Sequence, residues 1–491
     1  MNSQRISRRQ FLQRAGVGVG AALLTGTLAQ PARAETSHPN VLFLFADQMR
    51  EHAMTCSGDA NLQKVAEVSS NRETTNLDNL AAGGFRSTRC ISNYPLCSPF
   101  RSMLQTGLYP HETGVYVNSV IMQPPPSEST LPELFGNATY NYRTAYIGKW
   151  HLDGQPNPGS VRWRRGWQHW AGFNRGHQYN PYIDDPGVYW CTDWPGKPDD
   201  VKQSCTKFEP IEQTDLAIDW LNVHKDDTPW FMMISYGGPH GPYNETPQEY
   251  KDLYPKDIMQ LRDNVPSGRE SAAKTDLQGY YGHIKIIDEQ IGRLMDYLDT
   301  NGLADNTLIV FTADHGDMLF SHNREGKGVE FEEAIRVPFI ARLPESIPAG
   351  TVTEEKISSI DLYPTLCGLC GVTVPMSKGG MDLSGLLVGN SSTGRSEVFL
   401  FRRKFNKIGW FGVRTDQYTY AWDGDTGSAS SLFDNYADPY QFNNLANDGT
   451  HSAVQLQMHD LMISLMKQAN DPVTEKAIAA RSCMTGDFNI S

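Results

Sequence analysis

The sequence has few cysteines, no excess of basic residues and, beyond its N-terminal segment, no long hydrophobic run. Eight cysteines among 491 residues are too few for a fold that is stabilised mainly by disulfide bonds. The net charge of −13 excludes a general basic field that would recruit nucleic acid. We therefore expect a globular protein with no nucleic-acid partner and no membrane span in its mature chain.

The N-terminus carries the pattern of a bacterial export signal. Residues 7–12 read Ser-Arg-Arg-Gln-Phe-Leu, a modest apolar run follows, and residues 32–34 read Ala-Arg-Ala. This order is typical of a twin-arginine signal peptide, and the alternative is a basic helix that is retained. We expect residues 1–34 to be removed, the Tat translocon to be a partner, and the mature protein to be periplasmic or secreted.

Several apolar runs have the composition of buried parallel strands, and a helical pattern lies between the last two. The runs cover residues 41–45, 144–147, 230–235 and 307–312, and apolar residues recur at helical spacing over 281–298. Alternating strands and helices predict an α/β fold, a central mostly parallel sheet flanked by helices on both faces.

Each predicted strand is followed by polar residues that can do chemistry. Because ligands bind at the carboxyl ends of strands in open α/β sheets, these side chains could converge on one site. The alternative is that charged residues merely follow strands in loops. The residues concerned are Asp47, Lys149, His151, His240, Asp314 and His315.

Residues 97–101 read Cys-Ser-Pro-Phe-Arg. Pro99 predicts a helix start nearby, so that Cys97 faces the positive end of the helix dipole. Arg101 adds a fixed positive charge to whatever anion the cysteine position handles. The pentapeptide therefore favours chemistry on a sulfate or phosphate, and the alternative is a loop cysteine beside an ion-paired arginine.

An aromatic segment and two cysteine pairs allow more than one interpretation. Tryptophan and tyrosine recur over residues 162–194 beside Arg175 and His177, which suits either a sugar-binding cleft or an aromatic satellite core. Cys191 and Cys205 could form a disulfide across a polar loop. Cys367 and Cys370 lie in an apolar helical stretch, where we expect two core thiols.

The last hundred residues have a different pattern. After a polar, small-residue stretch at 389–394, β-rich segments cover residues 398–401, 407–413 and 418–422, and a helical pattern covers 451–469. We expect a catalytic domain over residues 35–388 and a smaller α+β subdomain with an antiparallel sheet over 389–491.

Taken in order, these motifs resemble the type I sulfatases of the alkaline phosphatase superfamily. The resemblance covers nearly all of the mature chain. It rests on Asp47-Gln48, Cys97-x-Pro99-x-Arg101, Gly148-Lys149-Trp150-His151, Pro239-His240, Asp314-His315-Gly316-Asp317 and Gly326-Lys327-Gly328.

The resemblance implies that a separate formylglycine-generating or sulfatase-maturing enzyme oxidises Cys97 to formylglycine (3-oxoalanine). A hydroxyl of the hydrated aldehyde would then attack sulfur. His240 would protonate the leaving oxygen, and His151 would deprotonate the second hydroxyl. The metal, Ca²⁺ with Mg²⁺ or Mn²⁺ as alternatives, would be held by Asp47, Gln48, Cys97, Asp314 and His315.

The same resemblance implies that Arg101, Lys149 and Lys327 neutralise negative charge in the site. Arg175 and His177 are the expected contacts to the sulfated carbohydrate, most simply a polysaccharide or oligosaccharide. Gln48 and His315 stand where many family members carry other residues. They keep open a phosphonate or phosphate diesterase and a choline-sulfatase-like enzyme. A non-catalytic binder of sulfated glycans would require Cys97 to remain a thiol.

Overall fold

The structure is a computed structural model. It describes residues 38–62, 71–118, 120–154, 164–174, 188–191, 201–204, 206–227, 229–375 and 379–485. The signal peptide expected at residues 1–34, Arg175, His177 and Cys205 lie outside these residues, as does the side chain of Cys191. No helix in the described part of the chain is long and apolar enough to cross a membrane.

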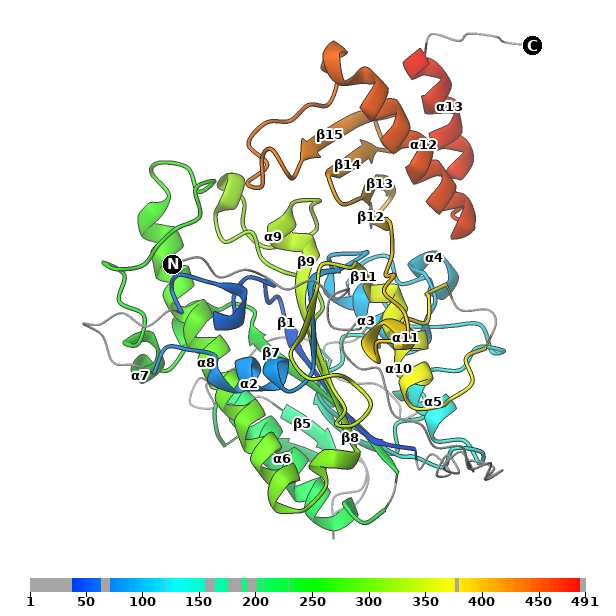
Figure 1. The fold of residues 1–491 in the computed structure, drawn as a ribbon. Coiled ribbons are helices and arrows are strands. Elements are labelled where there is room, and N and C mark those ends of the chain that lie inside the picture. The colour runs from blue at the N-terminus through cyan, green and yellow to red at the C-terminus, as the bar shows by residue number, and fades with distance from the viewer. Residues whose placement is uncertain are drawn as a thin grey trace, which may run out of the picture. The chain divides into compact units, whose positions relative to one another are not determined.

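A large mixed sheet forms the centre of the molecule (Figure 1). Its strand order is β10-β2-β9-β8-β1-β7-β3-β4-β5-β6, and β11 also pairs with β2. The strands are β1 (Asn40–Asp47), β2 (Phe85–Ile91), β3 (Arg143–Lys149), β4 (His169–Phe173), β5 (Val188–Cys191), β6 (Val201–Ser204), β7 (Trp230–Pro239), β8 (Thr307–Ala313), β9 (Arg336–Arg342), β10 (Thr351–Thr353) and β11 (Ile357–Ser358).

The four predicted strands are neighbours in this sheet. Strands β8, β1, β7 and β3 lie side by side and run parallel, which confirms the expected α/β architecture. Every residue of β1 and β8 is buried, because helices cover both faces of the sheet. In this register Ala46 pairs with Ala313, and Gly148 pairs with Ser235. The polar residues that follow the strands therefore emerge at one edge.

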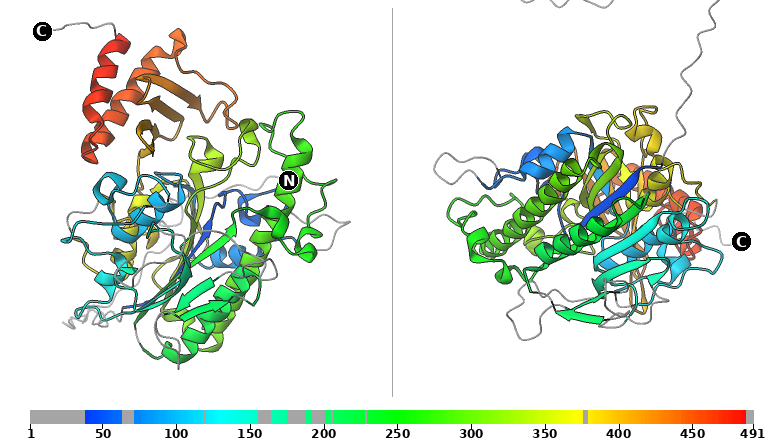
Figure 2. Two further views of the ribbon diagram at one scale, coloured as in Figure 1. Left: turned by 180° about the vertical axis from the view of Figure 1, so that it is seen from behind. Right: turned by 90° about the horizontal axis from the view of Figure 1, so that it is seen from below.

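Two groups of helices flank the sheet (Figures 1 and 2). Helices α2, α6 and α8 pack together on one side, and α3, α5, α10 and α11 form the group on the other. The helical pattern over 281–298 lies inside α8. The helices are α2 (Thr75–Ala82), α3 (Cys97–Thr106), α4 (Pro110–Thr113), α5 (Leu131–Phe135), α6 (Glu209–His224), α7 (Gln248–Lys251), α8 (Glu270–Thr300), α9 (Glu332–Ile335), α10 (Leu362–Leu369) and α11 (Ser384–Leu387).

Helix α3 begins at Cys97 itself, close to Pro99, near which the helix start was expected. Proline is tolerated in the first turn of a helix, because the amide groups there have no intrahelical acceptor. Cys97 is thus the first helical residue rather than a loop residue in front of the helix. Its position at the positive end of the dipole is as expected.

A second, four-stranded antiparallel sheet follows α11. Three of its strands match the β-rich segments of the sequence; the fourth, β15, was not expected. The predicted boundary after residue 388 lies between α11 and β12. The elements are β12 (Val398–Lys404), β13 (Lys407–Arg414), β14 (Tyr418–Asp423), β15 (Ser428–Asp434), α12 (Ser452–Gln468) and α13 (Thr474–Thr485).

The small sheet packs on the segment that leads into α3. The ring of Tyr94 meets Phe401 of β12 edge to face with centroids 5.0 Å apart, and Tyr109 contacts the same ring at 6.1 Å. These residues share one hydrophobic cluster with Met462 and Met466 of α12. Apolar packing therefore joins the second sheet to the helix that carries Cys97.

Two further expectations concern the core. Cys367 and Cys370 are both buried in the main hydrophobic cluster, as expected for core thiols. Trp167 and Trp170 also lie in this cluster, where Trp170 stacks on Tyr146 and Trp167 contacts the same ring at a tilt. These two tryptophans are therefore core residues, and the other aromatic side chains expected to contact sugar lie outside the part described.

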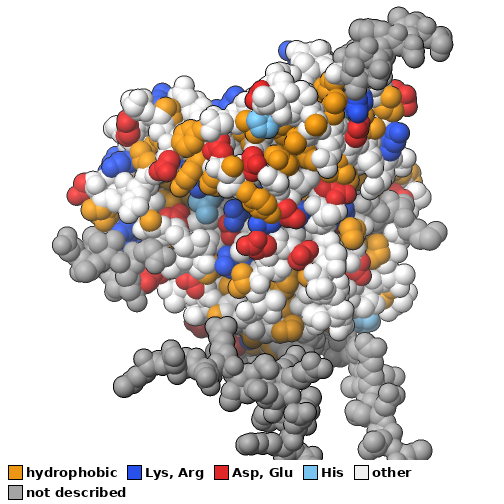
Figure 3. Space-filling view, turned by 45° about the horizontal axis from the view of Figure 1, so that its top comes forward, with side chains coloured by type: hydrophobic (Ala, Val, Ile, Leu, Met, Phe, Trp, Pro, Cys, Tyr) orange, Lys and Arg blue, Asp and Glu red, His pale blue; other side chains and the backbone are white. Residues whose placement is uncertain are grey.

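The face of the molecule drawn in Figure 3 carries charges of both signs. On the face drawn in Figure 3, Lys and Arg side chains gather near the middle, directly beside Asp and Glu side chains. With a net charge of −13, an anionic substrate must be attracted by such local groups.

Candidate active site

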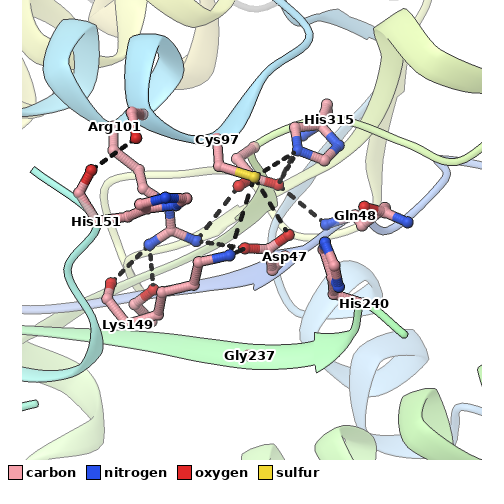
Figure 4. A network of polar contacts seen from close by, with 12 residues as sticks. Asp47, Gln48, Cys97, Arg101, Lys149, His151, Gly237, His240 and His315 are labelled. Atoms are coloured by element: carbon pink, nitrogen blue, oxygen red, sulfur yellow. Dashed lines mark hydrogen bonds and ion pairs between the residues drawn. The ribbon is translucent and has the colours of Figure 1, made fainter. Parts of the chain in front are cut away.

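The carboxyl ends of the four central strands meet at one pocket (Figure 4). Asp47 is the last residue of β1 and Lys149 the last of β3, while His240 and Asp314 directly follow β7 and β8. Gly148 allows the end of β3 to lie close to β7. Its φ is 107°, and a Cβ there would lie 2.1 Å from the carbonyl oxygen of Ser235.

Cys97 lies at the centre of the pocket and is only 1% exposed. Its Sγ is 3.2 Å from Nε2 of His315 and 3.9 Å from both Oδ1 of Asp47 and Nζ of Lys149. Burial and Asp47 act to raise the pKa of the thiol, but Lys149, Lys327 and His315 outweigh them and hold it well below its usual range. The pocket therefore stabilises negative charge at residue 97.

Four side chains beside one another could hold a metal ion. Ligand atoms of Asp47, Cys97, Asp314 and His315 all lie within 4.8 Å of one another. Nδ1 of His315 lies 2.9 Å from the carbonyl oxygen of Gly316, to which it donates as an N–H. In the neutral ring that a metal ion would require, this bond leaves the lone pair of Nε2 directed at the group, as in metal-binding histidines.

The charge state of the pocket also fits a cation. Burial and the nearby Asp47 raise the pKa of Asp314 to about 6, because two carboxylates face one small space. A divalent ion between them would offset this repulsion. The two carboxylate groups supply the oxygen ligands that Ca²⁺, Mg²⁺ and Mn²⁺ prefer, and the imidazole adds one nitrogen ligand.

Arg101 lies behind this group and fixes its carboxylates. One guanidinium nitrogen lies 2.9 Å from Oδ2 of Asp47 and 3.3 Å from Oδ2 of Asp314. The other donates to the carbonyl oxygen of Lys149 at 2.6 Å and to Oγ of Ser235 at 2.7 Å. Arg101 is 2% exposed, so its charge reaches the pocket through the residues that it orients.

Lys149 and Lys327 each bring an ammonium group to the pocket. Nζ of Lys149 lies 2.5 Å from Oδ2 of Asp47. Nζ of Lys327 donates to the side-chain oxygen of Gln48 and lies 2.7 Å from Nε2 of His240. The amide oxygen of Gln48, an expected metal ligand, is therefore engaged by an ammonium group in this structure.

His240 and His151 differ in what surrounds them. Nδ1 of His240 donates to the carbonyl oxygen of Gly241 at 2.7 Å, so Nε2 is the atom that faces Lys327. Burial and the Lys327 ammonium lower the pKa of His240 to about 4. Burial also lowers the pKa of His151, although a hydrogen bond with Cys97 acts in the opposite direction. Both rings are neutral near pH 7.

Three contacts that hold the site were not expected from the sequence. Asp317 accepts hydrogen bonds from the amide of Gln48 and from the hydroxyl of Tyr243, and Ser235 accepts one from Arg101. Asp317 also accepts from the backbone N–H groups of Leu319 and Gly326, at 2.9 and 3.0 Å, and so shapes the turn toward Lys327. The only local signal was its place in the Asp-His-Gly-Asp motif.

The small sheet supports the Lys327 loop. The carbonyl oxygen of Gly328 accepts hydrogen bonds from Arg402 at 2.8 Å and from the indole nitrogen of Trp410 at 3.1 Å. A Cβ at Gly328, whose φ is 84°, would lie 2.2 Å from the Arg402 guanidinium. Two residues of the second sheet therefore determine where the loop carrying Lys327 lies.

The fold and the pocket define a class of protein. A mostly parallel sheet flanked by helices, with a separate small antiparallel sheet, is the architecture of the alkaline phosphatase superfamily. A buried, anion-stabilising position among carboxylates, an imidazole and ammonium groups is suited to the hydrolysis of an anionic ester.

Comparison with known proteins gives the family. Residues 39–372 match the family model described as Sulfatase, and residues 322–468 match the model described as N-sulphoglucosamine sulphohydrolase, C-terminal. The chain therefore belongs to the sulfatase family, and it is a sulfuric ester hydrolase.

Individual relatives agree over almost the full length. The chain is 34% identical over 440 residues to the ulvan-active sulfatase of Formosa agariphila, covering 86% of this chain and 80% of that protein. It is 29% identical over 495 residues to the endo-4-O-sulfatase of Bacteroides thetaiotaomicron, covering 91% and 96%. The solved structure of YidJ from Bacteroides fragilis has a TM-score of 0.79 at 28% identity, covering 92% and 100%.

Proposed function

We propose that this protein is an exported sulfatase that removes sulfate from a polysaccharide or oligosaccharide. The observation that carries the proposal is the buried group of Asp47, Cys97, Asp314 and His315, with ammonium groups on two sides. The names of two relatives, an ulvan-active sulfatase and an endo-4-O-sulfatase, support a sulfated glycan as the substrate. The binder alternative lacks support, because a binding site does not need two carboxylates beside the anion.

Residue 97 would work as formylglycine, and Asp47, Asp314, His315 and residue 97 would hold the metal ion. Formylglycine, when hydrated, supplies a diol with one hydroxyl to attack sulfur and a second whose deprotonation expels sulfate. The cation, Ca²⁺ in our proposal with Mg²⁺ or Mn²⁺ as alternatives, supplies positive charge against the sulfate oxygens. Gln48 would join the ligands only if its side-chain oxygen leaves Lys327.

Lys149 and Lys327 hold the sulfate in this proposal. Nζ of Lys149 lies 3.9 Å from the atom that residue 97 presents, within reach of a hydroxyl at that position. Nζ of Lys327 lies on the His240 side, where the ester oxygen would leave. Lys149 is buried and Lys327 is partly buried, so their attraction for a sulfate is stronger than at the surface.

His240 and His151 move the protons. With Lys327 donating to its Nε2, His240 is neutral at rest. A bound sulfate offsets the lysine charge and favours protonation of the ring, which can then give its proton to the leaving oxygen. His151 is neutral and hydrogen-bonded to residue 97, so it can accept the proton of the second hydroxyl.

Maturation would precede folding and export. Cys97 is 1% exposed and cannot enter the active site of another enzyme in the folded protein. We infer that the maturing enzyme acts on the chain before it folds, and that the Tat translocon then carries the folded protein to the periplasm or outside. The mature protein would comprise a catalytic domain over residues 35–388 and a subdomain over 389–491.

The test is a parallel assay on defined esters. Sulfated oligosaccharides, 4-nitrophenyl sulfate, a phosphate diester and a phosphonate monoester are incubated with the purified protein, and the released anion is measured. We expect sulfate release, with the highest kcat/KM on a sulfated oligosaccharide. A preference for the phosphate or phosphonate ester would contradict the proposal and favour the diesterase.

A further inference from the structure

A cavity of about 550 Å³ opens between the tip of the β12–β13 hairpin and the segment that follows α4. We call it the hairpin pocket and define it by Tyr116, Arg403, Lys404, Phe405, Lys407 and Asp425. None of these residues belongs to the metal group or to its hydrogen-bond partners described above.

Both walls of the hairpin pocket are tied to the segment that leads into the nucleophile position. The hydroxyl of Tyr94 accepts a hydrogen bond from the backbone N–H of Arg403 at 2.7 Å and donates to the carbonyl oxygen of Tyr116 at 2.5 Å. Tyr94 stands three positions before Cys97, a stretch that spans at most about 10 Å. The pocket wall is therefore tied, through the Tyr94 hydroxyl, to a segment close in sequence to residue 97.

A second hydrogen bond links the pocket wall to α3. The side-chain oxygen of Asn118 accepts from the backbone N–H of Ser98, the residue after Cys97, at 3.1 Å. Asn118 follows Tyr116 and Val117, which line the pocket. The wall is thus fixed relative to the catalytic position from both ends of the 94–98 segment.

The two positive charges at the hairpin tip lower the stability of the hairpin, and the fold itself does not require them. Lys404 and Lys407 are directly opposite each other in the register of β12 and β13, a like-charged pair that destabilises a hairpin. Neither ammonium group makes a hydrogen bond or ion pair with another residue in the part of the chain that the structure describes. Asp425 lies nearby, but its carboxylate accepts from the backbone N–H groups of Ile408 and Gly409.

The side chain of Arg403 is held by other residues of the protein and is not available to bind a ligand. Its guanidinium is bonded to the buried Asp471 at 3.1 Å and lies over the ring of Tyr116 at 4.6 Å from the centroid. This fixed arginine leaves the two lysines as the available cations. An anion that enters the pocket would meet more positive than negative charge, although the chain as a whole is acidic.

Phe405 adds an apolar surface to this charge. Its side chain is 78% exposed, the largest fraction among the exposed large hydrophobic side chains of the described residues. The two-residue turn between β12 and β13 favours a residue such as Asn406, with φ of 57°, but gains nothing from a phenylalanine. An exposed aromatic ring beside lysines is suited to stack on a sugar ring whose neighbouring substituent is anionic.

From these contacts we propose that the hairpin pocket is a second subsite, which binds an anionic sugar of the same glycan whose sulfate is cleaved at residue 97. Lys404 and Lys407 pair with its sulfate or carboxylate group, and Phe405 stacks on its ring. The inference rests on the proposed function for the identity of the glycan. It adds that the protein binds chains better than single sulfated sugars.

The test compares substrates of different length in matched variants. The double variant Lys404→Gln/Lys407→Gln removes both charges and keeps roughly the same side-chain length. The control is Lys225→Gln, which replaces a lysine outside the hairpin pocket, directly after α6. We expect KM for ulvan hexasaccharides to rise about five- to tenfold in the double variant. KM for 4-nitrophenyl sulfate should remain unchanged, and Lys225→Gln should match the unaltered protein.

A binding measurement separates this inference from the proposed function. In the Cys97→Ser background, calorimetric titration with the hexasaccharides and with ulvan disaccharides gives affinities without turnover. Weaker hexasaccharide binding in the double variant, with less salt dependence, supports the subsite even if no sulfate is released from any ester. Equal affinity of the double variant and its parent for the hexasaccharides would overturn it, whatever the catalytic activity.

Phe405→Ala distinguishes stacking from charge. We expect it to weaken hexasaccharide binding about threefold while leaving the salt dependence intact, because the ring contributes contact area and no charge. Unchanged binding in this variant would overturn the assignment of Phe405 to the subsite.

Discussion

The catalytic pocket and the hairpin pocket both present cations to an anion, but the fold constrains them differently. In the catalytic pocket, Asp47, Arg101 and Lys149 are at most 2% exposed and are bonded to one another. In the hairpin pocket, Lys404 and Lys407 are exposed and Phe405 is 78% exposed. A change in the buried network should therefore affect every substrate, whereas a change at the hairpin should affect only long ones.

The largest effect is expected from Cys97→Ser. Serine fits the buried position, and a maturing enzyme that oxidises the Cys97 thiol would leave its hydroxyl unchanged, so kcat should fall by on the order of 10³-fold or more on every sulfate ester. The melting temperature should stay near that of the unaltered protein, since the side chain is similar in size. Released sulfate and a thermal scan measure the two quantities. Full activity in this variant would refute the diol mechanism.

Removal of the metal ion should have the next largest effect. Without a cation, the carboxylates of Asp47 and Asp314 face each other in one buried space, and Asp314 has a raised pKa for that reason. Dialysis against a chelator should lower kcat by about 10²-fold and reduce the melting temperature, and Ca²⁺ should restore both. The hairpin double variant serves as a control with the same metal dependence. Activity that survives complete chelation would contradict the proposed metal site.

Arg402→Ala tests whether the small sheet acts through Lys327. Loss of the hydrogen bond to Gly328 frees the loop, so kcat/KM should fall about tenfold on short and long substrates alike. Trp410→Phe keeps the ring but removes the second hydrogen bond, and about a threefold decrease is expected. If Arg402→Ala impaired only long substrates, Arg402 would belong with the hairpin pocket instead.

The smallest effect on activity is expected at Glu209, a buried carboxyl behind the catalytic pocket whose ionisation affects stability instead. Burial raises its pKa to about 8, although Gly237 donates a hydrogen bond to it at 3.0 Å. The folded protein retains this proton while the unfolded chain loses it near pH 4.5. Stability from this group is therefore complete below pH 4.5 and is lost as the pH rises to about 8.

Glu209→Gln cannot ionise and should remove this pH dependence. Between pH 5 and pH 9 the variant should lose about 2–4 kcal/mol less unfolding free energy than the unaltered protein. Urea unfolding at several pH values measures the difference, with Glu475→Gln on the surface of α13 as the matched control. Parallel pH profiles for both variants would contradict the raised pKa.

The sequence was sufficient to predict that the polar residues at the ends of four strands converge, because each of them ends or follows an apolar run. An apolar run that ends in Asp47 or Asp314 indicates both the strand and the edge at which it ends. Once four such runs are neighbours in a parallel sheet, their polar ends must meet. The contact between Asp317 and Gln48, 269 positions apart, has no such local signal.

One strand of the second sheet, β15, was not predicted, because its sequence also lacks a clear local signal. Residues 428–434 read Ser-Ala-Ser-Ser-Leu-Phe-Asp, and small polar residues conceal the alternation that forms β15. The role of the hairpin tip was also hidden, because Lys404 and Lys407 have the composition of an ordinary solvated turn. Only the structure brings them beside Tyr116, which lies far from them in the sequence.

The central claim is that residue 97 of the working enzyme is formylglycine. Fragment mass spectrometry of the tryptic peptide over residues 90–101, taken from active protein isolated from its native host, tests it directly. The account predicts an aldehyde at residue 97, with Cys90 of the same peptide unmodified. An intact Cys97 thiol in protein that releases sulfate at full rate would contradict it.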